Sequence, residues 1–129
     1  MEKKMGGRIL LVGNDDTLLL TRSAVVNTRW TSKMAHLHEA VSAMEEGTFD
    51  VIVLCHTIGR AEVEGFVRAV HAERPQTGFL VLEATSGSAA YVEELRRNEK
   101  IVADVVGTYA PGEMLRAIAK LLQTEANHA

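Results

Sequence analysis

Short, continuous runs of apolar residues recur along the chain and are separated by longer segments with a helical period. The runs are RILLV (8–12), VIVL (51–54), FLVL (79–82) and the weaker ADVV (103–106). Continuous rather than alternating hydrophobicity is typical of strands that are covered on both faces. A further segment around SKMAH (32–36) is short and partly polar, as an edge strand can be. The pattern therefore predicts five strands in one buried sheet.

The segments between these runs place apolar residues three and four positions apart, which is the spacing of one helix face. The five expected stripes are Leu19, Ser23, Val26 and Trp30; Leu37, Val41 and Met44; Val63, Phe66, Val67 and Val70; Tyr91, Val92 and Leu95; and Leu115, Ile118, Ala119 and Leu122. We expect Gly47 to close the second helix as its C′ residue, Ser88 to cap the fourth and Pro111 to stand in the first turn of the last. Strands alternating with helices at this spacing predict an α/β fold, with a parallel sheet, right-handed crossovers and helices on both faces.

Composition narrows the class of protein. The 129 residues suit a single domain, and 47% hydrophobic and 24% charged residues are ordinary globular values that argue against a disordered chain or a coiled coil. The net charge of −3 leaves no general basic face for nucleic acid. A single cysteine forms no internal disulfide, and neither a long apolar run nor a charged-then-apolar leader occurs, so we expect a soluble, cytoplasmic protein that does not bind membranes. We expect residues 1–7 to be a frayed end or a tag remnant, 8–123 to be the domain and 124–129 to be a tail.

The positions just after the strands are the candidate functional site. In a doubly wound sheet, ligands bind beyond the carboxyl ends of the strands, where the strand order reverses. The residues at these positions are Gly13, Asn14, Asp15 and Asp16; Cys55 and His56; Glu83, Ala84 and Thr85; and Gly107, Thr108 and Tyr109.

Four segments, taken in order, resemble the receiver domain of bacterial two-component response regulators. ILLVGNDD is similar to the first strand and its acidic turn, DVIVLCHTIG to the third strand, FLVLEAT to the fourth, and ADVVGTYAPGEMLRAI to the fifth strand with the last helix. The resemblance covers residues 8–123. It implies a flavodoxin-like, doubly wound, five-stranded sheet with strand order 2-1-3-4-5 and a role in phosphorelay signalling. It also implies a signalling partner: a histidine kinase, an output domain, a second receiver or a second copy of this chain.

The same resemblance implies a phosphoryl chemistry whose parts are missing here. The phosphate-accepting aspartate corresponds to Cys55, and the magnesium-binding acidic pair corresponds to Gly13 and Asn14, with Asp15 one step later. Acyl phosphate formation needs a carboxylate nucleophile and a hard cation that neutralises the phosphoryl charge. A thiol is a soft group that binds magnesium weakly, so we expect no metal at this site.

The switch positions that the resemblance implies are also replaced. The hydroxyl after the fourth strand corresponds to Glu83, the lysine after the fifth strand to Tyr109, and the aromatic switch residue to Val106. These replacements remove a hydroxyl and a positive charge and add a negative one, so we expect the pocket to repel phosphate. The sequence therefore predicts a pseudo-receiver that is not phosphorylated, is not an enzyme, uses no cofactor and acts by binding another protein.

Two alternatives remain open. In the first, a displaced carboxylate such as Asp15, Asp50 or Glu83 accepts the phosphoryl group. Asp50 is excluded because it begins the third strand, about 13 Å from the carboxyl end. In the second, Cys55 is a redox switch, although a free cysteine is more often packed as a small apolar group, and His56 next to it is expected to face the opposite side of the strand.

Other polar residues have plainer interpretations. Asp15 and Asp16 precede a helix, where carboxylates more often cap the helix than hold a cation. His36 and His38 are expected to meet on one strand face, but no other ligand group is assigned beside them, so we interpret them as solvent-facing.

In receivers, the face of the fourth helix, fifth strand and fifth helix usually docks partners; here it would carry Tyr91, Arg96, Arg97, Tyr109, Met114 and Leu115.

Overall fold

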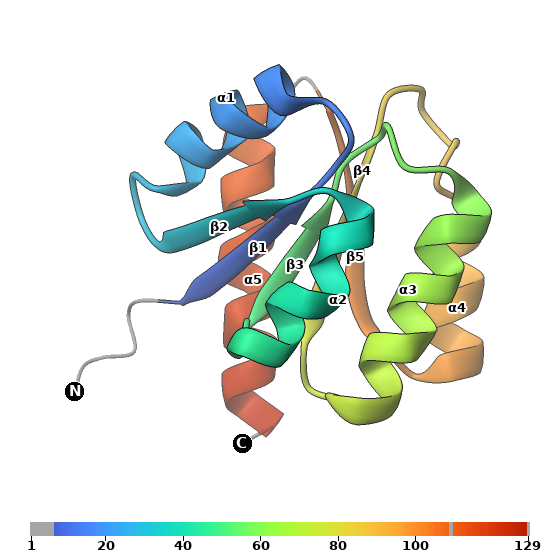
Figure 1. The fold of residues 1–129 in the computed structure, drawn as a ribbon. Coiled ribbons are helices and arrows are strands. Elements are labelled where there is room, and N and C mark those ends of the chain that lie inside the picture. Colours follow the sequence, from blue (N-terminus) through green and yellow to red (C-terminus); the bar gives the residue numbers. More distant parts are fainter. Residues whose placement is uncertain (1–6, 109, 129) are drawn as a thin grey trace.

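The computed structural model describes residues 7–108 and 110–128, with side chains up to residue 123. Strands and helices alternate along this part of the chain (Figure 1). They are β1 (Arg8–Val12), α1 (Asp16–Val26), β2 (Thr31–Ala35), α2 (Leu37–Glu46), β3 (Val51–Leu54), α3 (Arg60–Glu73), β4 (Gly78–Glu83), α4 (Tyr91–Glu99), β5 (Val102–Gly107) and α5 (Pro111–His128).

The strands form one parallel sheet in the order β2-β1-β3-β4-β5, so the predicted flavodoxin-like fold is confirmed. Val12 at the end of β1 lies beside Leu54 at the end of β3, and Glu83 at the end of β4 lies beside Gly107 of β5. The strand ends therefore share one edge of the sheet, which we call the carboxyl edge. β2, whose residues are mostly exposed, is an edge strand as predicted.

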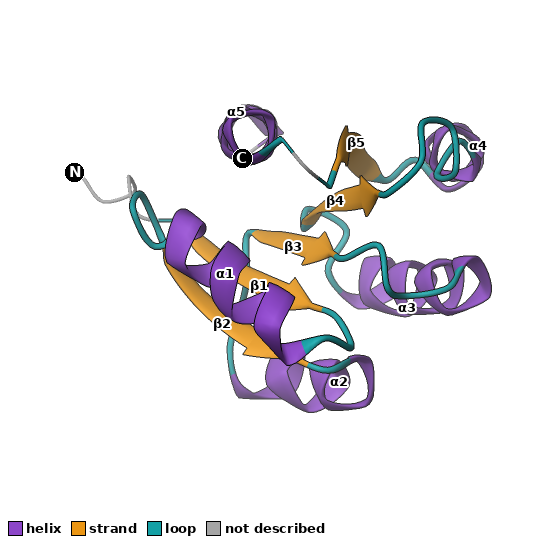
Figure 2. Ribbon diagram, turned by 90° about the horizontal axis from the view of Figure 1, so that it is seen from above, coloured by secondary structure: helices purple, strands orange, loops and turns teal. Residues whose placement is uncertain are grey.

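Helices cover both faces of the sheet (Figure 2). A hydrophobic core lies between the helices and the sheet on each face. Alternate strand residues such as Leu10, Ile52 and Phe79 pack under α2, α3 and α4, whereas Ile9 and Val53 pack under α1 and α5. β1, β3 and β4 are almost wholly buried because helices cover both faces, which explains their continuous hydrophobicity.

Two predicted helix faces are partly wrong. α1 ends at Val26, so Trp30 lies in the following loop rather than on a helical stripe. In α2 the side chain of Val41 is 55% exposed, and Ala40 and Ala43 are buried instead. Small alanine side chains let this helix approach the sheet closely, and a pattern that counts only large apolar residues misses them. The predicted stripe of α3 is buried in full.

The last helix differs from its prediction in face and in length. Its buried residues are Met114, Ala117, Ile118 and Leu121, so the buried face is centred about one residue away from the expected one. The helix continues to His128, and no tail begins at residue 124. At the other end of the domain Gly7 is buried, and its carbonyl accepts a hydrogen bond from the Thr31 N–H at 3.3 Å, so the fold includes this residue.

The helix ends test three predicted caps. Pro111 begins α5, as predicted. Gly47 is the C-cap of α2 itself with extended backbone (φ −172°), and a Cβ there would lie 2.8 Å from Nη1 of Arg8. The prediction for Ser88 is wrong, because α4 begins at Tyr91 and its N-cap is Ala90. α4 ends at Glu99, and its C-cap Lys100 adopts the left-handed conformation (φ 59°) in place of a glycine.

Candidate functional site

Cys55 lies at the centre of the carboxyl edge, directly after β3. Its side chain is 2% exposed, and its N–H donates to the carbonyl of Val12 at 2.9 Å, which extends the pairing of β3 with β1. A Cβ on Gly13 would lie 3.1 Å from the Cβ and 3.3 Å from the Sγ of Cys55. The two residues therefore fit together, and the glycine leaves the space that the thiol occupies.

The environment of Cys55 is that of a packed apolar side chain. It belongs to the core under α1 and α5, together with Leu11, Val53 and Leu82. Burial raises the pKa of the Cys55 thiol, and the charge and hydrogen bond of Arg22 oppose this only in part. A raised pKa leaves less thiolate at neutral pH, which weighs against a reactive thiol.

The Cys55 environment gives a direct prediction. We expect iodoacetamide to alkylate Cys55 slowly in the native protein and rapidly in urea. The native rate should rise only above the ordinary thiol pKa, because the folded protein disfavours the thiolate. Mass spectrometry over a pH series measures this rate. Fast alkylation of the native protein near neutral pH would favour the redox switch instead.

Arg22 reaches the carboxyl edge from α1 and was not assigned to the site from the sequence. The residue is only 7% exposed, and its Nη2 contacts Nδ1 of His56 at 3.4 Å and the hydroxyl of Thr108. The same hydroxyl lies 3.0 Å from His56 Nδ1. Side chains from α1 and from the segments after β3 and β5 thus form one polar cluster of Arg22, His56 and Thr108. We call it the Arg22 cluster.

The Arg22 cluster corrects the expected charge of the site. The premise that this edge has lost its positive charge is wrong, because the Arg22 guanidinium is there. Burial and the Arg22 charge lower the pKa of His56, while Asp15 partly opposes them, so His56 is neutral at pH 7. Arg22 follows Leu19 by three residues and precedes Val26 by four, which places it on the buried stripe of α1. A charged residue on a buried stripe is the sequence signal that marks Arg22 as unusual.

The acidic residues at this edge have structural partners instead of a shared ligand. Asp15 is the N-cap of α1, and its Oδ1 accepts from the Leu18 N–H at 3.1 Å, so the predicted capping role is confirmed. The Asn14 N–H donates to the Thr57 hydroxyl at 3.1 Å. Asp16 turns toward β2, where its Oδ1 lies 2.5 Å from Nε2 of His36. Among the described residues, these carboxylates form no cluster with a third metal ligand at Cys55.

Glu83 and Val106, two of the three switch positions that the resemblance implies, have structural roles. Glu83 accepts the Ala89 N–H at 3.0 Å, so its carboxylate holds the loop between β4 and α4. Val106 is partly buried and packs on the core under α1 and α5. Tyr109 lies outside the described residues. Asp50 lies just before β3, at the edge of the sheet opposite the carboxyl edge, where it accepts the Arg8 N–H at 2.9 Å. This position agrees with its exclusion as a phosphoacceptor.

The predicted partner-binding residues that the structure describes do not share one surface. Met114 is 4% exposed and packs into the core, so its place in a docking surface is wrong. Tyr91 is half-buried on the side of α4 that faces α3, and the Arg60 guanidinium lies 5.0 Å from its ring centre. Arg96 and Arg97 are exposed, and Leu115 is partly exposed.

A hollow of about 350 Å³ opens on the expected face between α4, β5 and α5. Its charged lining residues are Arg96, Lys100, Lys120 and Asp104, so positive charges outnumber negative ones. β5 is the last strand at this side of the sheet, and it lines the hollow. All of its residues except the buried Ala103 are partly exposed. We call this surface the β5 hollow.

Several solved structures with the same fold are receiver domains. The signal receiver domain of an HD domain-containing protein from Pseudomonas fluorescens Pf-5 is 14% identical, with a TM-score of 0.80 over 99% of this chain and 95% of that one. A CheY-like response regulator receiver domain protein from Methanospirillum hungatei JF-1 is 16% identical, with a TM-score of 0.79 over 96% and 99%. The beryllofluoride-activated NtrC4 receiver domain dimer is 18% identical, with a TM-score of 0.76 over 92% and 98%. No family model and no curated protein sequence matches the chain. At these identities the likeness shows a receiver-like fold.

Proposed function

We propose that this protein is a receiver-like signalling module of a two-component system that works without accepting a phosphoryl group. The observation that carries the proposal is Cys55, a buried thiol at the end of β3 with no carboxylate in its place. Asp15 and Asp16, the nearest acidic residues in the first loop, are engaged with a helix N-terminus and with His36. Among the described residues, no group of three metal-ligand side chains gathers at Cys55, so a hard cation has no ligand set at this edge.

The positive charge at the carboxyl edge belongs to Arg22, and its partners are side chains of the protein itself. In a phosphorylated site, a positive side chain opposes the charge of the transferred group. Here the Arg22 guanidinium is directed to His56 and Thr108, and the residue is almost fully buried. This arrangement supports a fixed conformation of the edge that needs no bound phosphate to complete it.

The β5 hollow is the surface that we assign to partner binding. Exposed arginine is common in protein interfaces, and an edge strand offers unpaired backbone groups to a partner. The excess of positive charge favours an acidic patch on a histidine kinase, an output domain or another receiver. A second copy of this chain is also a candidate, because the NtrC4 neighbour is a dimer. A cytoplasmic location and the absence of catalytic activity belong to the same proposal; no helix among the described residues is both long and apolar enough to cross a membrane.

The double variant Arg96→Glu/Arg97→Glu is expected to weaken binding of a histidine kinase, output domain or receiver partner by at least tenfold. Both side chains are exposed, and Arg96 pairs only with Glu93 of its own helix at 2.8 Å, so the fold should be unaffected. Arg29→Glu is the control, because it reverses the charge of another exposed arginine, in the loop before β2 and away from β5. Isothermal titration calorimetry with and without beryllofluoride and magnesium gives the affinity. Equal affinities for all variants would reject the surface, and tighter binding with beryllofluoride would reject phosphorylation independence.

A further inference from the structure

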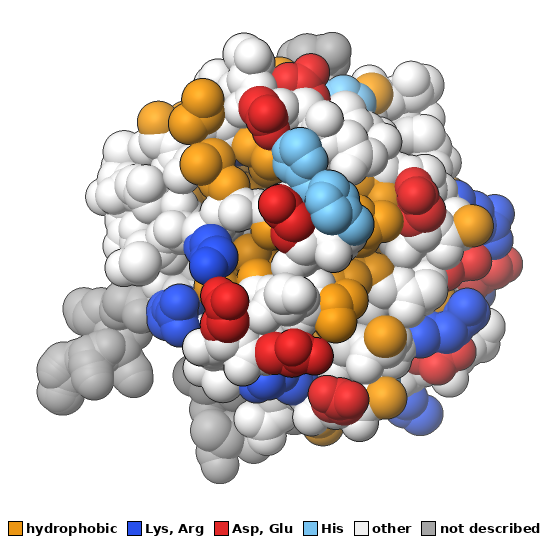
Figure 3. All heavy atoms as spheres, viewed as in Figure 1, with side chains coloured by type: hydrophobic (Ala, Val, Ile, Leu, Met, Phe, Trp, Pro, Cys, Tyr) orange, Lys and Arg blue, Asp and Glu red, His pale blue; other side chains and the backbone are white. Residues whose placement is uncertain are grey.

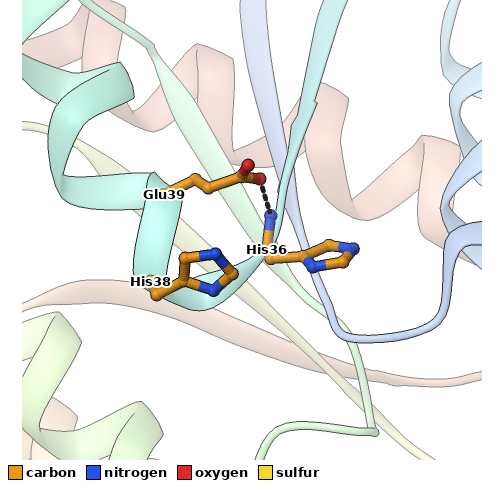
Figure 4. Close-up of side chains that lie close together, drawn as sticks. All are labelled: His36, His38 and Glu39. Carbon is orange, nitrogen blue, oxygen red and sulfur yellow. Dashed lines mark hydrogen bonds between the residues drawn. The ribbon is translucent and has the colours of Figure 1, made fainter.

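Two histidines and a glutamate lie close together where β2 ends and α2 begins. His36 is the N-cap of α2, and His38 and Glu39 are in its first turn (Figure 4). One ligand atom from each of the three lies within 4.8 Å of the other two. The imidazole rings meet edge to face, with 5.7 Å between their centres. The prediction that these histidines share a strand face is therefore wrong, because the chain turns into a helix between them.

Hydrogen bonds orient these side chains and still leave ligand atoms available. Oε1 of Glu39 accepts the His36 N–H at 3.0 Å, and a carboxylate has a second oxygen to offer. Nε2 of His36 is 2.5 Å from Oδ1 of Asp16, which leaves Nδ1 for another partner. Metal-binding histidines usually donate their other ring N–H to a carboxylate, which fixes the ring and raises the basicity of the ligating nitrogen. Asp16 comes from α1, so this contact is independent of the three-residue cluster.

We propose that His36, His38 and Glu39 bind one divalent transition-metal ion of the zinc class, with Asp16 holding His36 in orientation. Imidazole nitrogen with carboxylate oxygen suits Zn²⁺, Cu²⁺ and Ni²⁺, whereas Mg²⁺ and Ca²⁺ take oxygen ligands. Three protein ligands leave a fourth tetrahedral position for water or for a group from a partner.

The cluster can reach the geometry of a metal site by small side-chain rotations. Zinc bonds of about 2.0 to 2.1 Å place tetrahedral ligand atoms roughly 3.4 Å apart, so separations of up to 4.8 Å must shrink by at most roughly 1.4 Å. His38 and Glu39 are exposed, so neighbouring side chains leave room for these rotations, and Glu39 can turn its second oxygen to the ion while Oε1 keeps the His36 N–H. Figure 3 shows neighbouring histidine side chains on the surface with acidic side chains beside them, so an ion can reach the cluster directly from solvent.

Calorimetric titration of the untagged protein with ZnCl₂ tests the site at about pH 8, above the ordinary histidine pKa. We expect one Zn²⁺ per chain and no heat from MgCl₂. His38→Ala should weaken zinc binding at least tenfold. Asp16→Asn should weaken it by about 10-fold to 100-fold, the usual effect of losing such a second carboxylate.

Glu39→Gln has a matched control elsewhere in the chain. Glutamine can still accept the His36 N–H, so the helix start should be kept while the metal-binding carboxylate is lost. Glu62 occupies the same position in the first turn of α3, where it accepts the Gly59 N–H at 3.2 Å, and it is in no cluster of metal ligands among the described residues. Glu62→Gln should therefore bind zinc as the wild type does.

Nuclear magnetic resonance of the histidine rings locates the bound ion. We expect zinc to shift the ring signals of His36 and His38 and to leave those of His56 and His71 in place. No zinc binding by the wild type would overturn the proposal. So would several weakly bound ions per chain, or unchanged affinity in both His38→Ala and Glu39→Gln.

Discussion

Arg22→Glu is expected to lower the free energy of unfolding by about 3 to 5 kcal/mol, the usual loss when a buried charge is left without compensation. The Arg22 side chain is almost wholly buried, and its Nη2 is the group that meets His56 and Thr108. A carboxylate in this place would face a neutral imidazole and would lie on the same edge as Asp15. Urea unfolding at about pH 8, where histidine is neutral, measures the loss.

Arg22→Met is the control for this prediction, because it keeps a long unbranched side chain, introduces no negative charge and removes the guanidinium with its contacts to His56 and Thr108. Its loss should be much smaller, since an apolar residue of similar volume often replaces a buried ion at little cost. Among the residues that the structure describes, none accepts a hydrogen bond from Nη1 of Arg22, so the wild-type charge is itself imperfectly compensated. The pKa of His56 should rise in Arg22→Met, because the Arg22 charge lowers it in the wild type. Equal losses for the two variants would show that volume, and not charge, governs this position.

Gly13→Asp, which introduces an acid at the first position of the implied pair, is expected to destabilise the fold by about 3 kcal/mol. A Cβ at this position meets Cys55 at 3.1 Å and Leu19 at 3.3 Å, and overpacking of this kind costs about 1 to 3 kcal/mol. The carboxylate adds further atoms and a partly buried charge to the same contact. We expect no gain in magnesium affinity, because Asn14 and Cys55 supply no second carboxylate.

Two alanine variants separate the steric effect from the charge. Gly13→Ala should lose about 1 to 3 kcal/mol through the Cβ contact alone. Gly65→Ala makes the same change in the middle of α3, where a Cβ meets nothing within 4 Å, and should gain about 0.5 to 1 kcal/mol of stability. Thermal and urea unfolding compare the three variants. A stable Gly13→Asp protein that binds magnesium would contradict the steric account.

The fold could be predicted from the sequence because its strands are buried on both faces. Four apolar runs marked the strands directly, and the spacing of Val63, Phe66, Val67 and Val70 marked the buried face of α3. The errors came from weaker signals. Trp30 continues the helical spacing of α1 in sequence, but the helix ends earlier, and the alanines of α2 do not stand out as core residues.

The site was less predictable, because it depends on where long side chains reach. The thiol at the end of β3 could be placed from the sequence, because strand register fixes it. The sequence marks Arg22 only as a charged residue on the buried stripe of α1. Its contacts could not be placed, because the side chain extends to residues after β3 and β5 that are distant in sequence. The contact between Asp16 and His36 similarly joins two elements, so a search for metal ligands at fixed spacing does not find it.

The most direct test of the central claim is intact mass spectrometry of the protein after incubation with acetyl phosphate and magnesium. A receiver domain that retains its aspartate, treated in parallel, shows that the reagent is active. We predict that this protein gains no phosphoryl group and that Cys55→Ala gives the same result, because no carboxylate and no magnesium site stand at the end of β3. A phosphoryl adduct on any side chain at the carboxyl edge would contradict the account.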